Sequence, residues 1–306
     1  MGTPDFAVKP LERLYDDGHD IACVLTQPDR PRDRGLKTVF CPVKCLAMSH
    51  NTPIYQPDSL SDPELITILR DMRADIIVVV AYGKKLPSEI LHLPPYGCIN
   101  LHGSLLPRYR GAAPVQWAVL NGDLVTGVTS MYMTEEIDAG DIIYSTETSI
   151  GEDETSGELR DRLCGLGAEI LSDSINTIMR NEVIRIPQNH SEATYAPALT
   201  KECSPICWTD TAYKIKCRVR GLNPWPVATT RIFGTTFKVY SVDICGAGAV
   251  TAPGTIVSTG AQGIVVACAD GTVTIRDIQA PGGKRMATAE YLKGHPICPG
   301  NAGAAG

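Results

Sequence analysis

An amide, an imidazole and a carboxylate occur in the sequence at positions where they could act together in acyl transfer. Asn100 and His102 lie two residues apart in an apolar stretch, Cys98–His102, that has the composition of a β-strand. Because side chains alternate along a strand, both should project from one face, opposite Leu101. Asp138 follows the next expected strand, in the turn sequence Ile-Asp-Ala-Gly. We expect the three side chains to meet at neighbouring strand ends, where open α/β sheets bind ligands.

The three residue types meet the needs of transfer of an acyl group to an amine. Asn100 can donate to a carbonyl oxygen that becomes an oxyanion, and one such donor is typically worth about 10²–10³ in rate. His102 can move a proton near neutral pH, and Asp138 can accept a hydrogen bond from the imidazole. Each residue alone is more often a cap, a turn or a surface residue, so the prediction depends on the combination. Asp141 is the alternative carboxylate. A covalent mechanism through Ser104 is not favoured, because the chain has no Gly-x-Ser-x-Gly elbow.

The surrounding elements predict a two-domain α/β protein. Strand and helix patterns alternate through residue 143, which indicates a doubly wound, mostly parallel Rossmann-like sheet with helices on both faces. After a short basic helix, five short strand patterns separated by turns indicate a small OB-like β-barrel. We therefore divide the chain into a catalytic domain (1–185), a linker (186–206) and an OB-like domain (207–306).

Composition and motifs exclude several classes of protein. The chain has 306 residues, enough for two cores. Its longest uncharged apolar run, residues 76–82, is too short to cross a bilayer, and no leader pattern precedes the first helix. Its 11 cysteines are scattered, with no Cys-x-x-Cys pair, so we expect free thiols in a cytoplasmic protein and no metal site. Neither a dinucleotide fingerprint nor a P-loop occurs, which disfavours nicotinamide and nucleoside triphosphate cofactors.

The formal charge is distributed unevenly along the chain. The whole protein carries −6, but from residue 201 onward 11 Lys and Arg stand against 6 Asp and Glu, a net charge of +5. Residues 1–200 therefore carry −11. A basic carboxyl-terminal domain on an acidic body is suited to a polyanionic partner, although a domain of this charge can also simply be soluble.

The residues around Asn100 also match a known pattern. The matching pieces are Asn100-x-His102, the turn Ser104-Leu105-Leu106-Pro107, Tyr109-Arg110-Gly111 and Ile137-Asp138-Ala139-Gly140. Together, at this spacing, they resemble the signature of the 10-formyltetrahydrofolate-dependent formyltransferases. Gly2-Thr3-Pro4-Asp5-Phe6-Ala7 and Asn223-Pro224-Trp225-Pro226 resemble in particular the members that act on initiator methionyl-tRNA. The likeness covers nearly the whole chain.

The resemblance implies roles for particular residues. It makes Asn100, His102 and Asp138 the catalytic group and 10-formyltetrahydrofolate the formyl donor. It assigns folate binding to the turn Ser104, Leu105, Leu106 and Pro107, and contact of the pterin with the backbone of Val80, Ala81 and Tyr82. It makes the polar loop 27–40 an RNA-contacting insertion. The expected RNA-binding side chains are Arg34 and Lys37 in that loop, and Lys214, Lys216 and Arg218 in the basic helix.

The resemblance also implies a monomeric, cytoplasmic enzyme with initiator methionyl-tRNA and folate as its partners. Two alternatives stay open from the sequence. One is a sibling formyltransferase that acts on a small amine, against which the basic carboxyl-terminal domain argues. The other is a non-catalytic RNA-binding relative, against which the intact catalytic group argues.

The beginning of the sequence departs from the resembled pattern. Members of the family have a buried strand directly before the first loop, and here Met1 stands where that strand would end. In a doubly wound order the first strand is central, so its loss would leave two unpaired neighbours. We expect that the native chain carries a few further apolar residues before Met1.

Overall fold

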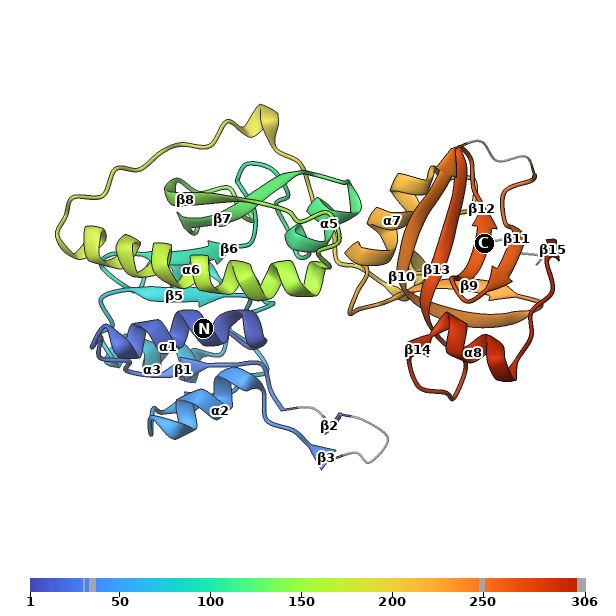
Figure 1. Cartoon of the computed structure of the whole chain (residues 1–306). Helices are drawn as coiled ribbons and strands as arrows, with labels where there is room; N and C mark the ends of the chain where they lie inside the picture. Colours follow the sequence, from blue (N-terminus) through green and yellow to red (C-terminus); the bar gives the residue numbers. More distant parts are fainter. Residues whose placement is uncertain (30, 33–36, 248–250, 302–306) are drawn as a thin grey trace. The chain divides into compact units, whose positions relative to one another are not determined.

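The computed structural model describes residues 1–29, 31–32, 37–247 and 251–301, which fold into two compact units (Figure 1). The first unit comprises residues 1–114, 125–149 and 160–197, and the second comprises residues 115–124, 150–159 and 198–306. No helix in the described part of the chain is long and apolar enough to span a membrane.

The first unit is built on a sheet with a parallel and an antiparallel half. Its central strands are β5 (Ile77–Val80), β6 (Cys98–His102), β7 (Val125–Tyr132) and β8 (Ile142–Ser149), in that order. β5 and β6 are parallel, whereas β6–β7 and β7–β8 are antiparallel. Residues 133–141, which join β7 to β8, are too few for the crossover that a parallel pair requires. The four-stranded sheet is therefore mixed, whereas the pairs Gly2–Val80 and Val24–Ile54 are parallel, as predicted.

The start of the chain lies between β5 and a second parallel pair, β1 (Val24–Leu25) with β4 (Ile54–Tyr55). The Gly2 amide donates to the Leu25 carbonyl at 3.0 Å, and the Val80 amide donates to the Met1 carbonyl at 2.9 Å. A Cβ added at Gly2 would lie 2.9 Å from the Val80 carbonyl oxygen, so only glycine fits this close approach. Beyond these contacts lies an apolar cavity of about 320 Å³ between β1, β5 and the neighbouring helices. β1 and β5 are thus bridged by two residues.

Helices cover both faces of this sheet, as predicted. On one face, α6 (Ser156–Met179) packs so closely over β6 that a Cβ at Gly167 would lie 2.6 Å from Leu101 Cδ2. α1 (Val8–Asp16) lies beside α6, joined by a 2.5 Å hydrogen bond from Ser172 Oγ to Asp17 Oδ2. The opposite face carries α3 (Pro63–Asp71) and α4 (Ser88–Leu91), which share a core with β5 and β6. The other short elements of the chain are η1 (Asp5–Ala7), β2 (Pro31–Arg32), β3 (Lys37–Thr38), α2 (Pro42–Ser49), α5 (Pro114–Leu120), η2 (His190–Glu192) and η3 (Lys201–Cys203).

The second unit contains an antiparallel sheet with the helices α7 (Ala212–Gly221) and α8 (Thr288–Gly294). It also includes residues 115–120 of α5 and residues 156–159 of α6. The strands are β9 (Ala228–Ile232), β10 (Thr235–Ala247), β11 (Thr255–Gly260), β12 (Gly263–Ala267), β13 (Gly271–Gln279), β14 (Met286–Ala287) and β15 (Gly300–Asn301). Their order is β15-β11-β12-β13-β10-β9, with β14 paired to β13. Among the described residues β9 and β15 do not pair to close this sheet, so the predicted OB-like barrel is not confirmed.

Candidate active site

Strand β6 presents Asn100 and His102 on one face, as its alternation predicted. β6 is held between β5 and β7, with Asn100 opposite Val79 and Met131 in the two ladders. Leu101 points the other way, toward Gly167 of α6. Because ladders on both sides fix the backbone of β6, the amide and the imidazole have fixed positions on the face that turns toward Asp138.

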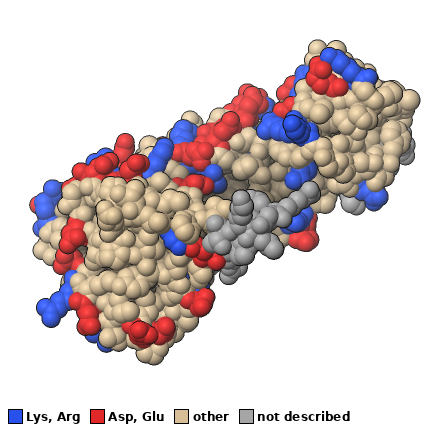
Figure 2. Space-filling view, turned by 90° about the horizontal axis from the view of Figure 1, so that it is seen from below, with Lys and Arg blue, Asp and Glu red and all other residues tan. Residues whose placement is uncertain are grey.

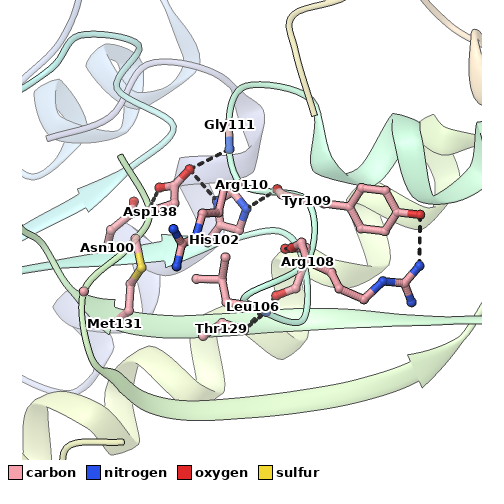
Figure 3. Close-up of polar contacts among 12 residues, drawn as sticks. Asn100, His102, Leu106, Arg108, Tyr109, Arg110, Gly111, Thr129, Met131 and Asp138 are labelled. Atoms are coloured by element: carbon pink, nitrogen blue, oxygen red, sulfur yellow. Dashed lines mark hydrogen bonds and ion pairs between the residues drawn. The ribbon is translucent and has the colours of Figure 1, made fainter. Parts of the chain in front are cut away.

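The carboxylate of Asp138 is the point at which the three side chains meet (Figure 3). Its Oδ2 accepts a hydrogen bond from the Gly111 amide at 2.8 Å and lies 3.6 Å from His102 Nδ1. Its Oδ1 lies 3.5 Å from Asn100 Nδ2. The first contact has ordinary hydrogen-bond length, and the other two are long. The Gly111 amide therefore anchors the carboxylate, whereas the Asn100 amide and the His102 imidazole lie slightly beyond normal hydrogen-bond distance from it.

The tautomer of His102 follows from its second ring nitrogen. Nε2 lies 2.9 Å from the Tyr109 carbonyl oxygen, which can only accept a hydrogen bond. Nε2 therefore carries a proton, and Nδ1 is the ring nitrogen that faces Asp138. His102 is 5% exposed, so the imidazole lies in a nearly enclosed site. This arrangement suits a group that moves a proton during the reaction.

The two residues that contact the ring nitrogens of His102 have a left-handed backbone. Asp138 has φ of 51° and Tyr109 has φ of 60°. Residues other than glycine rarely adopt this conformation, and it costs of the order of 1–3 kcal/mol where surrounding contacts hold it. The two residues supply the carboxylate and the carbonyl that flank His102. Strain is thus located at the atoms that orient the imidazole.

Several partners of the catalytic group were not predicted. The Gly111 amide and the Tyr109 carbonyl belong to a matched piece of the sequence, but main-chain roles leave no mark in a residue pattern. Gln188, which contacts the main chain of Asp138, was assigned to the linker. The rival carboxylate Asp141 meets β7 through its main chain, because its carbonyl accepts from the Tyr132 amide. Asp138 is thus the carboxylate that contacts His102 and Asn100, and its catalytic role stays a prediction.

The turn predicted to bind folate is anchored to β7. Thr129 Oγ1 donates to the Ser104 carbonyl at 2.7 Å and accepts from the Leu106 amide at 3.2 Å. Ser104 Oγ donates to the Arg108 carbonyl at 2.6 Å. Ser104 is fully buried, and its hydroxyl is engaged within the turn. Leu106 is buried, whereas Leu105 and Pro107 are partly exposed.

The second predicted folate segment has one exposed residue. The Val80 amide is bonded to Met1, and the Tyr82 carbonyl accepts from Gln27 Nε2 at 2.9 Å. The Tyr82 side chain is buried, and burial raises the pKa of its phenol to about 12. Its hydroxyl has no hydrogen-bond partner among the described residues. Ala81 is exposed, so of the three predicted residues it is the most accessible to a ligand.

The predicted RNA-binding residues lie in different environments. Arg34 lies outside the described residues; Lys37 lies in β3, and its side chain is likewise outside them. Lys214 on α7 is exposed. Lys216 pairs with Asp153 at 2.7 Å and Glu152 at 3.2 Å, and Arg218 Nη1 donates to the Cys203 carbonyl at 2.9 Å. On the face drawn in Figure 2, basic and acidic side chains lie among one another. The described His, Cys, Asp and Glu residues form no group that could hold a metal ion.

Comparison with known proteins places this chain in a family. The family described as "Formyl transferase" matches residues 1–175, and "Formyl transferase, C-terminal domain" matches residues 198–296. The methionyl-tRNA formyltransferase of Alkaliphilus oremlandii is 47% identical over 301 residues, which cover 98% of this chain and 97% of the relative. That of Acetivibrio thermocellus is 45% identical over 298 residues, covering 97% of this chain and 96% of the relative.

A likeness of fold extends to solved structures. WlaRD, a sugar 3N-formyl transferase solved in the presence of dTdp and 5-N-formyl-THF, superposes with a TM-score of 0.66 at 18% identity. The match covers 91% of this chain and 95% of WlaRD. The family matches and the curated relatives identify the chain, whereas this likeness concerns its fold. The chain belongs to the formyl transferase family, among the methionyl-tRNA formyltransferases.

Proposed function

We propose that this protein transfers the formyl group of 10-formyltetrahydrofolate to the α-amino group of the methionine carried by initiator transfer RNA. The product is N-formylmethionyl-tRNA, which serves translation initiation in the cytoplasm. The observation that carries the proposal is the convergence of Asn100, His102 and Asp138 in a chain with full-length methionyl-tRNA formyltransferase relatives.

The three side chains match the three tasks of the transfer. The amine attacks the formyl carbon, a C–N bond forms, and the carbonyl oxygen becomes an oxyanion to which Asn100 Nδ2 can donate. The amine must then lose a proton, which His102 Nδ1 accepts beside the Asp138 carboxylate. The bond from the formyl carbon to N10 of the folate breaks, and that nitrogen takes up the proton that His102 has accepted. Amide, imidazole and carboxylate supply these functions without a metal ion.

Binding of the folate is assigned to the segments that flank the catalytic group. The turn Ser104, Leu105, Leu106 and Pro107 follows β6 directly and is braced by Thr129. Ala81 lies at the end of β5, next to β6 in the sheet, with Val80 and Tyr82 beside it. The presence of 5-N-formyl-THF with WlaRD supports a formyl-folate as donor. Every described contact of the catalytic group lies within the first unit, so we infer that a monomer is sufficient.

Binding of the RNA is assigned to the second unit together with the loop 27–40. Residues from 201 onward carry +5, whereas the preceding part carries −11. Lys214 is the exposed candidate on α7, and we retain Lys216, Arg218, Arg34 and Lys37 as further contacts. We keep formyl transfer in domain 1–185, linker 186–206 and an OB-like RNA-binding domain 207–306. Binding through phosphates should weaken steeply as salt rises.

The test compares amine acceptors under one formyl donor. Initial rates with charged initiator transfer RNA are measured beside those with an amino-sugar nucleotide and with glycinamide ribonucleotide. We expect kcat/KM for the RNA to exceed both by orders of magnitude. A preference for a small amine would make this a sibling enzyme, and the fold does not decide because WlaRD shares it. Salt-sensitive RNA binding without any turnover would indicate a non-catalytic relative.

A further inference from the structure

We propose that Gln188 is a positioning residue, which holds Asp138 in the conformation that aims its carboxylate at His102 and Asn100. Gln188 lies 50 positions after Asp138 in the sequence, in the segment between α6 and α7, whose helices are the short η2 and η3. Its side chain is 6% exposed and lies behind the turn that carries Asp138. The inference rests on the proposed function, because it concerns a group that the proposal makes catalytic.

The amide nitrogen of Gln188 bonds both ends of the Asp138 turn. Nε2 donates to the Asp138 carbonyl at 2.9 Å and to the Gly140 carbonyl at 2.7 Å. A side-chain amide has two N–H donors, and both find an acceptor here. Asp138 has φ of 51°, a conformation that must be held by its surroundings. The two bonds fix the carbonyl groups of this turn, and so set the direction in which its side chain points.

The amide oxygen of Gln188 faces Arg110. It accepts from Arg110 Nη2 at 2.7 Å and from Nε at 3.2 Å. Arg110 is 1% exposed, and its other described contacts are His190 Nδ1 at 3.2 Å and Glu136 Oε1 at 3.5 Å. A buried guanidinium requires acceptors on its donors, so the oxygen of Gln188 cannot exchange places with its nitrogen. The orientation of the amide is thereby fixed from both sides.

These contacts close a ring of interactions around the carboxylate. Gly111, the residue after Arg110, donates its amide to Asp138 Oδ2 at 2.8 Å. The backbone of Arg110 is itself held by the Thr194 carbonyl at 2.8 Å and the Ala196 amide at 2.7 Å. The ring runs from the Asp138 carboxylate through Gly111 and Arg110 to Gln188, and back to the Asp138 carbonyl. The Gln188 side chain therefore connects the Arg110–Gly111 segment, which holds the Asp138 carboxylate, to the main chain of Asp138.

Two substitutions distinguish the donor contacts of Gln188 from its acceptor contacts. Gln188→Met removes the donors to the Asp138 turn and the acceptor for Arg110, with a side chain of similar length. Gln188→Glu keeps an acceptor for Arg110 but places a carboxylate against two carbonyl groups, so the turn loses both donors. We expect both variants to lower kcat by about 10–100-fold, because small displacements of a catalytic group have effects of this size. KM for folate and for RNA should change by less than about threefold.

A matched control and a measurement without substrate complete the test. Asn189→Ala alters the adjacent residue, which caps η2 and makes no described contact with Asp138. It should leave kcat unchanged. Exchange of the Gly111 amide proton, followed by NMR, should accelerate about tenfold or more in both Gln188 variants and stay as in the wild type in Asn189→Ala.

The outcomes distinguish a positioning role of Gln188 from a general loosening of its segment. Wild-type kcat and slow Gly111 exchange in Gln188→Glu would overturn the inference, because the donors to the turn would then be dispensable. Equal loss of kcat in Asn189→Ala would also overturn it, by reducing the effect to general loosening of the segment. If the wild-type protein formylated no RNA, the proposed function would fail, and Gly111 exchange would still decide the role of Gln188.

Discussion

Replacement of Asp138 by asparagine separates the charge of this residue from its place in the structure. An asparagine Oδ1 can still accept from the Gly111 amide, which lies 2.8 Å from the carboxylate in the wild type. Asparagine also adopts the left-handed backbone (φ of 51° here) more readily than most residues. The fold should therefore lose no more than about 1 kcal/mol. Asp138→Ala would be a poorer test, because it also leaves the Gly111 amide without its acceptor.

The chemical step should be affected far more than the fold. The negative charge 3.6 Å from His102 Nδ1 is lost, and an amide group takes its place. General acid–base groups typically contribute about 10²–10⁴-fold, so we expect kcat to fall by this factor. That range corresponds to about 3–5 kcal/mol of transition-state stabilisation. Because Asp138 is assigned to chemistry and not to binding, KM for folate and for RNA should remain within about threefold.

The assay is single-turnover formylation of charged initiator transfer RNA by the wild type and two variants. Asp141→Asn is the matched control, since it makes the same substitution three residues away. Thermal unfolding of all three proteins checks that their folds are equally stable. A rate for Asp138→Asn within tenfold of the wild type would refute the role given to this carboxylate. So would an equal loss in Asp141→Asn.

Three further substitutions test the surrounding structure. Tyr82→Phe should stabilise the protein by about 1 kcal/mol, because it removes a buried hydroxyl that has no described partner. Burial raises the pKa of this phenol from 10.0 to about 12, so above pH 10 the phenol ionises in the unfolded chain before it does in the folded protein. The wild type therefore loses stability as the pH rises, by at most about 1.4 kcal/mol per pH unit. Urea unfolding at pH 8 and pH 11 should show the advantage of Tyr82→Phe growing at the higher pH, and a constant difference would contradict the assignment. Thr129→Val removes both bonds to the Ser104–Leu106 turn and should raise KM for folate about tenfold without changing KM for RNA. The same effect in Thr126→Val, another buried threonine of β7, would argue against the turn. Lys214→Ala should weaken RNA binding and lower the slope of log K against log salt by about 1, whereas Lys293→Ala, whose lysine is paired with Glu290, should not. Identical salt slopes for the two variants would remove Lys214 from the interface.

The sequence predicted well what depends on neighbouring residues. The residue pattern predicts a helix at 42–49 and strands at 228–232 and 263–267, and α2, β9 and β12 have these bounds. The alternation of β6 correctly placed Asn100 and His102 on one face. These features follow from local periodicity, because the spacing of apolar residues indicates the type of element and the face that it buries.

Other features depend on partners that are distant in the sequence. The residue pattern also predicts a strand over 20–26. Only Val24–Leu25 lies in a ladder, because β4 pairs there and residues 20–23 line the cavity instead. Whether β7 runs parallel or antiparallel to β6 depends on the side of the sheet from which the chain re-enters it, and the periodicity of a sequence does not report this. The anchor of Asp138 is a backbone amide, and its brace is Gln188 in a segment read as a linker. Main-chain donors and single long-range side chains have no local signature, so they emerge only from the structure.

The central claim is that the group formed by Asn100, His102 and Asp138 moves a formyl group from folate to an amino acid on RNA. It is tested most directly with 10-formyltetrahydrofolate labelled in its formyl carbon and initiator transfer RNA charged with methionine. After incubation with the protein, the amino acid is released from the RNA and examined by mass spectrometry. We predict that the label appears in N-formylmethionine at a rate set by the protein concentration. Label that stays on the folate, or appears only as free formate while the protein is folded, would contradict the account.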